Sequence, residues 1–351
     1  MQNIKNQRNS ISKSIRKFAL DQGFDLIGFS QIKPNAEAYN HYKKWLGKKF
    51  EADMLYMSKK EAILKRKSAA NLLKNAKSVI SLAVNYYHPQ PPLQKGHGRI
   101  ARYAYGRDYH KIIKKKLEAV EDFIKTKSDT AQTLSYVDTG PILERTFAVQ
   151  AGLGFIGKNS CLITKEFGSW VFLAEIITDL EISSSPGTHS GQPEETSNPG
   201  IHSLQPRGMS NPGICGTCAR CIDACPTKAI TRDKNGKYFI NAKRCLSYLT
   251  IEYKGPASRI SRELKYAISK TKRIFGCDIC QEVCPHNCRP KITTHKEFSI
   301  PKIASDSISI KKILSIKNEE EFVKLFAGSP LMRAKLKSLR RNAKVFTKTN
   351  T

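Results

Sequence analysis

Eight of the ten cysteines fall into two groups with short, regular spacings. The first group reads C-x-x-C-x-x-C-x-x-x-C-P and consists of Cys215, Cys218, Cys221 and Cys225. The second group has one isolated member followed by C-x-x-C-x-x-x-C-P, and consists of Cys245, Cys277, Cys280 and Cys284. In bacterial ferredoxins such a run places three thiolates on one 4Fe-4S cluster and the fourth on a second cluster. The spacing therefore predicts two 4Fe-4S clusters in a ferredoxin-like module.

The usual exchange of one cysteine between the two runs predicts which thiolates hold each cluster. The first cluster is expected on Cys215, Cys218, Cys221 and Cys284. The second cluster is expected on Cys225, Cys245, Cys277 and Cys280. Zinc fits less well, because four-cysteine zinc sites usually pair two C-x-x-C knuckles and need no third cysteine nearby. Disulfides fit poorly in a chain expected to be cytoplasmic, and Cys161 and Cys288 are expected to be ordinary thiols.

The charge of the chain favours a polyanionic partner. Sixty Lys and Arg residues against thirty Asp and Glu give a formal net charge of +30, so nucleic acid is the leading candidate. The alternative is a basic bias spread evenly over the surface. Residues 331–345 contain no acidic residue and six basic ones, which at helical spacing predict a cationic surface. The six are Arg333, Lys335, Lys337, Arg340, Arg341 and Lys344.

The pattern of apolar residues predicts an α+β fold in four segments. An α/β domain is expected at 1–181, a Ser/Pro/Gly-rich linker or loop at 182–213, the ferredoxin-like domain at 214–295 and a basic helical tail at 296–351. Strands are expected at 26–29, 78–87 and 133–137, with two more in 160–179 joined near Gly168. Helices are expected at 11–22, 109–126, 141–151 (with Pro141 in its first turn), 310–326 and 331–345.

The apolar runs and the amino terminus give no sign of a membrane or export segment. The longest apolar runs are far shorter than the roughly 20 residues needed to cross a bilayer. The amino terminus lacks the apolar core and cleavage site of an export signal. We therefore expect a cytoplasmic protein that does not associate with a membrane.

Six motifs resemble the epoxyqueuosine reductases, in the order in which that family has them. The first four are RYAYGRDYH (102–110), VDTGPILER (137–145), AGLGFIGKN (151–159) and CIDACPTKAI (221–230). RCLSYLTIE (244–252) and FGCDICQEVCP (275–285) follow, and the similarity covers about residues 10 to 345. The sequence departs from the family in its longer insert before Cys215 and in His286, where a Trp is common.

The resemblance implies cobalamin beside the two clusters, and reduction of epoxyqueuosine to queuosine in the anticodon loop of tRNA. It implies that Asp138, which ends an expected strand, is the proton donor. From the residues alone, Asp138 could instead cap the helix that follows. A donor needs a raised pKa, so we expect an apolar setting covered by the corrin.

The matching motifs also imply a set of cobalamin contacts. They are Arg66, Tyr103, Asp138, Arg145, Lys158, Asn159, Leu162, Cys277 and Asp278. The alternatives are a salt bridge of Arg145 with Glu144 or a neighbour, and a solvated surface charge for Lys158. His110 begins H-x-x-I where the corrinoid motif D-x-H-x-x-G needs glycine, so cobalamin is expected without a histidine ligand from the protein.

Two other functions remain open at this stage. A corrinoid reductive dehalogenase would share the cofactors, but those enzymes usually carry a twin-arginine export signal, which is absent here. A non-catalytic ferredoxin-like electron carrier would bind no cobalamin. For the reductase, the electron donor is expected to be a flavodoxin, a ferredoxin or a similar protein, and the enzyme is expected to be a monomer.

Overall fold

The computed structural model describes residues 2–33, 35–184, 215–299 and 305–348. Contacts group the chain into two compact units. The first consists of Met1–Lys44, Tyr56–Asn85 and His110–Cys218, and the second of Trp45–Leu55, Tyr86–Tyr109 and Ala219–Thr351. Both units mix helices and strands, which confirms the predicted α+β class. The expected linker at 182–213 lies outside the described residues from 185 onward. The four segments expected from the sequence were divided by function, whereas the two units are defined by contacts alone. The bounds of the four segments therefore stay a prediction.

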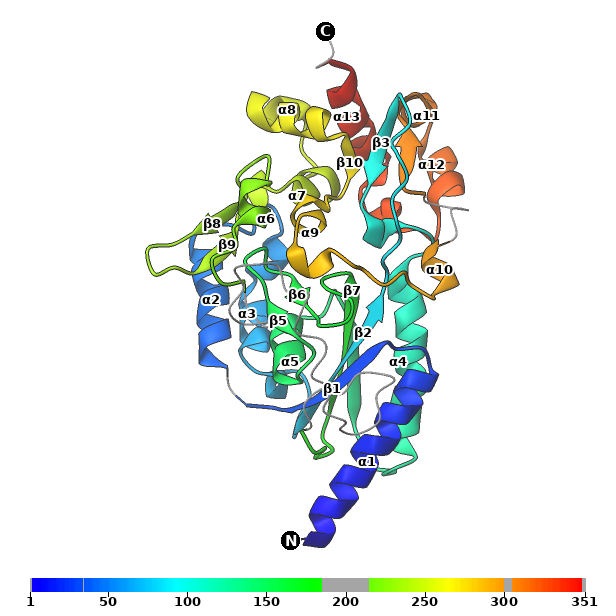
Figure 1. Ribbon diagram of the computed structural model, residues 1–351. Helices are drawn as coiled ribbons and strands as arrows, with labels where there is room; N and C mark the ends of the chain where they lie inside the picture. The colour runs from blue at the N-terminus through cyan, green and yellow to red at the C-terminus, as the bar shows by residue number, and fades with distance from the viewer. Residues whose placement is uncertain (1, 34, 185–214, 300–304, 349–351) are drawn as a thin grey trace. The chain divides into compact units, whose positions relative to one another are not determined.

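The first unit is built on one four-stranded sheet (Figure 1). Its strands, in spatial order, are β1 (Leu26–Gln31), β2 (Ser78–Asn85), β7 (Val171–Thr178) and β4 (Thr133–Val137). All three ladders are antiparallel, although helices alternate with strands along the chain. Every residue of β2 is buried, as its apolar and β-branched sequence predicts. The strand expected at 78–87 is confirmed as β2, inside this sheet, although it ends at Asn85, and the strand expected at 133–137 is confirmed as β4, at the edge of the sheet.

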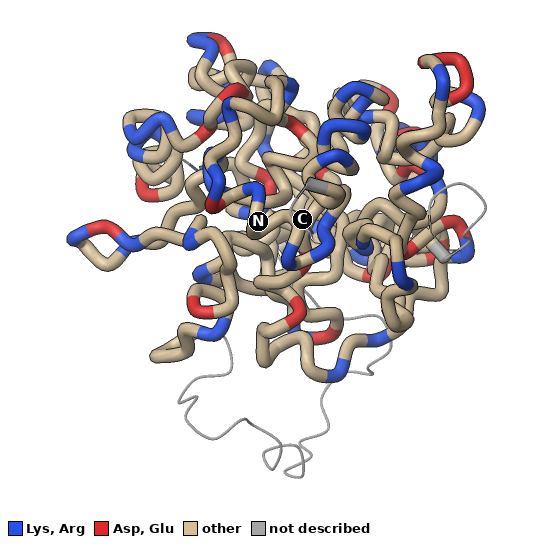
Figure 2. The backbone as a smooth tube through the Cα atoms, turned by 90° about the horizontal axis from the view of Figure 1, so that it is seen from above, with Lys and Arg blue, Asp and Glu red and all other residues tan. Residues whose placement is uncertain are grey.

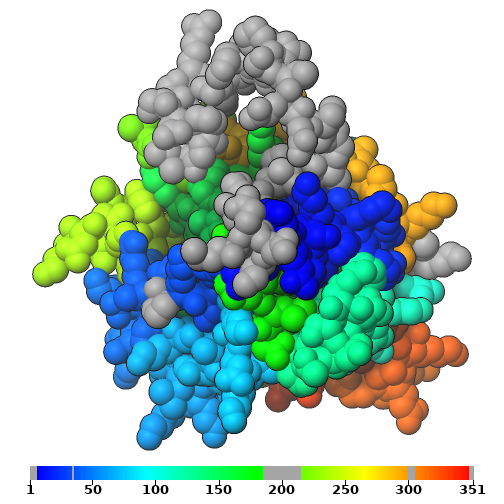
Figure 3. Space-filling view, turned by 90° about the horizontal axis from the view of Figure 1, so that it is seen from below, coloured from blue at the N-terminus to red at the C-terminus, as the bar shows by residue number. Residues whose placement is uncertain are grey.

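Two helices, α1 (Gln2–Asp21) and α4 (Tyr109–Lys125), lie side by side in Figures 1 and 3. Phe18 of α1 stacks on Phe123 of α4, with ring centroids 4.2 Å apart. The guanidinium of Arg16 lies over the ring of Phe29, which places α1 on the β1 face that carries Phe29. The helix α1 begins nine residues before the expected start at 11, and ends before Gly23, whose φ of +82° stops it.

The opposite face of the sheet is covered by α5 (Glu144–Gln150). The approach is close, because a Cβ added to Gly28 of β1 would lie 2.2 Å from the carbonyl oxygen of Ala151. The helix expected at 141–151 is wrong at its start: α5 begins at Glu144, and Pro141 lies in the turn after β4 rather than in a first helical turn. The chain turns sharply there because Asp138 has a left-handed φ of +57°.

Of the two strands expected in 160–179, β6 (Leu162–Ile163) pairs with β5 (Phe155–Ile156) and not with β7. The helices α2 and α3 span Ala36–Gly47 and Lys60–Lys67.

The second unit holds the cysteine-bearing helices α6 (Arg220–Asp223) and α9 (Ile279–Glu282). Its strands are β8 (Ile230–Arg232) paired with β9 (Tyr238–Ile240), and the sheet β10 (Arg273–Phe275), β3 (His97–Ile100) and β11 (Ser307–Ser309). Its other helices are α7 (Leu246–Ile251), α8 (Arg262–Thr271), α10 (Lys296–Ser299), α11 (Ile310–Ser315), α12 (Glu319–Phe326) and α13 (Lys335–Lys348). The single helix expected at 310–326 is wrong, because Asn318 accepts a hydrogen bond from the Glu321 amide and starts α12 anew.

The last helix, α13, packs against α7, α8 and β10 in one hydrophobic core. Its Arg341 is 8% exposed and donates hydrogen bonds to the carbonyls of Leu249, Tyr253 and Gly255, at the end of α7 and just beyond it. The prediction that all six basic residues of 331–345 form a cationic surface is therefore wrong for Arg341. Arg333 forms an ion pair with Glu252.

Basic residues are distributed along the whole described trace (Figure 2). Lys335, Lys337 and Lys344 of α13 are exposed, so a cationic strip remains on this helix. No helix among the described residues is both long and apolar enough to cross a membrane.

Candidate functional site

Asp138 follows β4 directly and occupies a tight turn at the end of the sheet. The Thr139 amide donates a hydrogen bond to the Val137 carbonyl, and Asp138 tolerates the left-handed φ better than most residues would. Its side chain is 55% exposed, and its Oδ2 lies 3.6 Å from Nε2 of His110. The capping alternative is wrong, because the residue that precedes α5 as its cap is Leu143. The apolar setting expected for this carboxyl is not supplied by the described residues of its own unit.

A buried cation lies beside this turn. Arg66, in the last turn of α3, is buried, and its guanidinium lies over the ring of Tyr42. Its Nη2 donates a 3.4 Å hydrogen bond to the carbonyl of Gly140, two residues after Asp138. The structure thus brings together two of the residues predicted from the sequence, a carboxylate and an arginine.

Two further carboxyl groups lie near Asp138, and reasoning from the sequence missed both. Burial, followed by the charge of Asp138, raises the pKa of half-buried Glu144 to about 8, against the opposing charges of Arg145 and Arg66. Burial, followed by the charges of Glu144 and Asp138, also raises the pKa of Glu175 well above its ordinary range. A signal was available, because Glu175 is the only ionisable residue of β7.

The loop that precedes β6 and the first residue of β6 carry three predicted contacts. Lys158 Nζ donates hydrogen bonds of 2.8 Å to the carbonyls of Gly216 and Cys218, so its interpretation as a solvated surface charge is wrong. Buried Asn159 accepts a hydrogen bond from the Cys161 amide through Oδ1. Leu162 is buried in β6.

Arg145 does not form the alternative salt bridge with Glu144 in the described structure. Its Nη1 donates a hydrogen bond to the carbonyl of Ser160 instead. The exposed guanidinium of Arg145 therefore fixes the loop at Ser160 to the first turn of α5.

The second unit holds the remaining predicted contacts. Asp278 is almost fully buried, and its Oδ2 accepts hydrogen bonds from the Arg102 amide at 2.8 Å and from Arg102 Nη1 at 3.3 Å. Burial raises the pKa of Asp278, and the bonds from Arg102 oppose that rise. Tyr103 packs edge-on against Tyr109, with ring centroids 6.3 Å apart.

The cysteines have the chemistry that iron-sulfur clusters need. None of the ten cysteines forms a disulfide, and α6, which carries Cys221, contacts α9, which carries Cys280. Burial raises the pKa of Cys277 to about 12, and the charge of nearby Cys245 adds to this effect. The Ala229 amide donates a 3.3 Å hydrogen bond to Sγ of Cys225. Among the described residues, no group of three or more His, Cys, Asp or Glu side chains lies close enough together to hold a metal ion. The fit to the clusters therefore rests on the chemistry of these residues, because partly shielded sulfurs with amide donors suit thiolates that are neutralised by iron.

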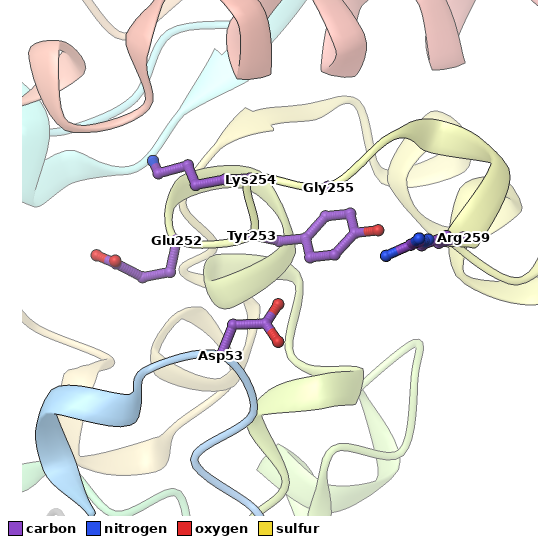
Figure 4. Close-up of a pocket in the computed structure, with 6 residues that line it drawn as sticks. All are labelled: Asp53, Glu252, Tyr253, Lys254, Gly255 and Arg259. Carbon is purple, nitrogen blue, oxygen red and sulfur yellow. The ribbon is translucent and has the colours of Figure 1, made fainter. Parts of the chain in front are cut away.

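A surface pocket of about 500 Å³ in the second unit contains none of the predicted site residues (Figure 4). It is lined by Asp53, Glu252, Tyr253, Lys254, Gly255 and Arg259. Lys254 Nζ is occupied by the carbonyls of Ile251 and Arg333, which gives this side chain a structural role. We assign no chemistry to this pocket.

Two family models match the chain. One describes epoxyqueuosine reductase QueG, DUF1730, and matches residues 66–139, a range that runs from Arg66 to just past Asp138. The other describes a 4Fe-4S double cluster binding domain and matches residues 214–287, which contain all eight predicted cluster ligands.

Curated relatives are similar over nearly the whole chain. An epoxyqueuosine reductase of Leadbetterella byssophila is 35% identical over 331 residues, which are 94% of this chain and 96% of that protein. An epoxyqueuosine reductase of Cyclobacterium marinum is 38% identical and covers 93% of this chain and 94% of its own length.

Solved structures agree with these relatives. An epoxyqueuosine reductase bound to an epoxyqueuosine-modified tRNA-Tyr stem loop aligns with a TM-score of 0.78 at 29% identity, over 96% of this chain and 80% of that one. An epoxyqueuosine reductase from Bacillus subtilis, solved with its aspartate-bearing catalytic loop swung out of the active site, aligns with a TM-score of 0.75 at 28% identity, over 96% of this chain and 81% of that one.

Proposed function

Because the chain belongs to the epoxyqueuosine reductase family and is an oxidoreductase of that kind, we propose that Asp138 supplies the proton when epoxyqueuosine in tRNA is reduced to queuosine. The family's cofactors are two 4Fe-4S clusters and cobalamin. The observation that carries the assignment is the place of Asp138: an exposed carboxyl in a left-handed turn at a strand end, beside Arg66 and His110. The relative from Bacillus subtilis also carries an aspartate on a loop, which is described as its catalytic loop.

The reaction needs two electrons and two protons. Uptake of the two electrons and two protons converts the epoxide into a carbon-carbon double bond and one water molecule. Iron-sulfur clusters deliver electrons singly, and bound cobalamin supplies a centre that can collect them and engage carbon. Because an unprotonated alkoxide is a poor leaving group, an acid must stand close to the epoxide oxygen. Asp138 is placed in a turn from which its carboxyl is exposed to a substrate.

The chain offers suitable donors for both kinds of cofactor. One cluster would be held by Cys215, Cys218, Cys221 and Cys284. The other would be held by Cys225, Cys245, Cys277 and Cys280. Arg66, Arg145 and Asn159 offer hydrogen-bond donors for the amide and phosphate oxygens of a corrin, and Leu162 offers an apolar surface. Tyr103, Lys158, Cys277, Asp278 and Asp138 complete the proposed contacts.

The partners follow from the same assignment. The substrate is tRNA carrying epoxyqueuosine in its anticodon loop, as supported by the related complex with a modified stem loop and by the net charge of +30. A tRNA substrate favours a cytoplasmic enzyme. The electron donor is a flavodoxin, a ferredoxin or a similar protein, and the enzyme acts as a monomer.

Anaerobic turnover of epoxyqueuosine tRNA, followed by mass analysis of the nucleosides, tests the proposal. We expect queuosine from the reconstituted enzyme and none from Asp138→Asn, a substitution that removes the proton but keeps the left-handed turn accessible. The Asn variant should still take up cobalamin, seen in its absorbance. Asp129→Asn, in an exposed turn of the same unit, is the matched control and should keep full turnover. Turnover by Asp138→Asn would refute the donor, and failure of the wild-type protein to take up cobalamin would favour the electron carrier.

A further inference from the structure

A second carboxyl group is enclosed between the sheet of the first unit and α5. Alternate residues of a strand share one face, so Glu175 of β7 projects to the same side as Leu173 and Ile177. Both of these pack in clusters with residues of α5, which identifies the α5 side of the sheet. Glu175 is 0% exposed, and neither of its carboxyl oxygens has a hydrogen-bond partner among the described residues.

The first turn of α5 directs Glu144 toward the same space. Phe147, Ala148 and Ala151 form the buried stripe of α5, and Glu144 stands three, four and seven residues before them on that stripe. In the strand register, Glu175 lies opposite Ser81 of β2 and Tyr136 of β4. The hydroxyl of Ser81 is buried and also has no hydrogen-bond partner among the described residues.

Burial of two neighbouring carboxyl groups is costly for stability and needs another explanation. Removing a polar group from water without a hydrogen-bond partner costs free energy, and removing an ionised one costs more, so both groups prefer to keep their protons. The raised pKa values of Glu144 and Glu175 agree with this. Perturbed carboxyls next to a reacting group are typical of functional sites. Glu144 also lies six residues after the proposed donor, Asp138.

We propose that Glu175 and Glu144 form a proton store that reloads Asp138 within a turnover. The inference rests on the proposed function, in which the reaction consumes two protons and Asp138 carries one at a time. After Asp138 has protonated the epoxide oxygen, the O–H bond of Glu144 breaks and an O–H bond forms on Asp138. Glu175 then returns a proton to Glu144, and solvent refills the store after the product leaves. No electron is transferred in these steps.

The charged and titratable groups around the store define its setting. The pKa of Glu144 is raised by the charge of Asp138, in the turn between β4 and α5, and lowered by the charges of Arg145 of α5 and Arg66 of α3. The pKa of Glu175 is raised by the charges of Glu144 and Asp138, and Glu175 pairs with Tyr136 of the neighbouring strand β4. His110 of α4 faces Asp138. Neither glutamate is proposed to touch the reacting atoms, so both act through Asp138.

Single-turnover rates of the reconstituted holoenzyme across pH test the store. We expect Glu175→Gln to react at nearly the wild-type rate at about pH 6, where solvent can supply the second proton, and about tenfold more slowly at about pH 8.5. Glu144→Gln, at a half-buried position, should show the same pH-dependent loss and serves if Glu175→Gln does not fold. Glu118→Gln, exposed on α4, is the matched control and should follow the wild-type profile. A loss of equal size at every pH would show a purely structural role and would overturn the proposal.

Infrared spectroscopy of the holoenzyme without substrate gives a readout that is independent of turnover. The carbonyl band of a protonated carboxylic acid should be present at neutral pH in the wild-type protein and should weaken in Glu175→Gln. An absent band in the wild-type protein would overturn the store. By contrast, a wild-type enzyme that forms no queuosine, or an active Asp138→Asn variant, would overturn the proposed function while leaving the infrared result intact.

Discussion

Asp138 and Glu175 are the two carboxyl groups at the ends of the proposed proton path, one 55% exposed after β4 and the other fully buried in β7. The sequence correctly predicts Asp138 at the end of a strand, because β4 and the turn after it depend on residues that are neighbours in the sequence. Glu175 was missed because its importance depends on which face of the sheet α5 covers. The face that α5 covers is decided by tertiary packing, which cannot be predicted from residues that are neighbours in the sequence.

The raised pKa values predict how stability changes with pH. The pKa of Glu144 rises from an ordinary 4.5 to about 8 in the folded protein, so the folded state holds this proton more tightly than the unfolded chain. The resulting stabilisation is fully present below about pH 4.5 and is lost as pH rises through about 8. Glu175→Gln removes a second carboxyl group whose pKa is raised in the folded protein, and with it that group's own share of the pH dependence, so the decline should flatten. Urea unfolding over that pH range measures the slope.

Glu118→Gln is the control for the stability measurement as well, because the exposed carboxyl on α4 has no comparable setting. It should keep the wild-type slope. The interpretation fails if Glu175→Gln and wild-type protein lose stability in parallel across the whole range.

Among the secondary-structure elements, the strands of the four-stranded sheet were predicted, whereas the strands of the second unit and several helix ends were not. The apolar and β-branched residues of β2 and β4 are sufficient to predict these two strands, because the same residues do not favour another secondary structure. The start of α5 was misplaced, because Pro141 favours a first helical turn but here follows the left-handed Asp138. Arg341 was misjudged because a run of basic residues does not reveal which of them faces the core.

The close contact between α5 and β1 predicts a sharp response to one methyl group. Gly28→Ala would place its Cβ 2.2 Å from the carbonyl oxygen of Ala151, so backbone must move. We expect a loss of about 1–3 kcal/mol in the free energy of unfolding, as for other overpacked sites. Because α5 carries Glu144, the same shift should lower turnover. Chemical denaturation and the nucleoside assay measure both effects.

Gly47→Ala is the matched control, since an added Cβ at the end of α2 meets nothing within 4 Å. It should leave the free energy of unfolding unchanged or raise it by about 0.4–1 kcal/mol. Equal stability of the two variants would contradict the close packing of α5 on β1.

At the scale of the whole molecule, the spacing of the cysteines was more informative than the composition. Binding one cluster requires cysteines at fixed short spacings in the sequence, so this motif can be recognised without knowing the fold. The net charge of +30 indicates a polyanion but does not locate it, and Lys and Arg are in fact distributed along the whole described trace (Figure 2). The segment 331–345 was expected to stand out, and Lys335, Lys337 and Lys344 of α13 are exposed within it.

The salt dependence of tRNA binding decides between a localised and an even distribution of phosphate contacts. Each contact contributes about 0.7–0.9 to the slope of log affinity against log salt concentration, because each neutralised phosphate releases counterions. Replacing Lys337 and Lys344 with Gln should therefore reduce the slope by about 1.5 for an epoxyqueuosine stem loop. The same change at Lys13 and Lys17, exposed on α1, should reduce it far less. Equal reductions by the two pairs would favour an evenly spread basic surface and would remove α13 as a preferred phosphate contact.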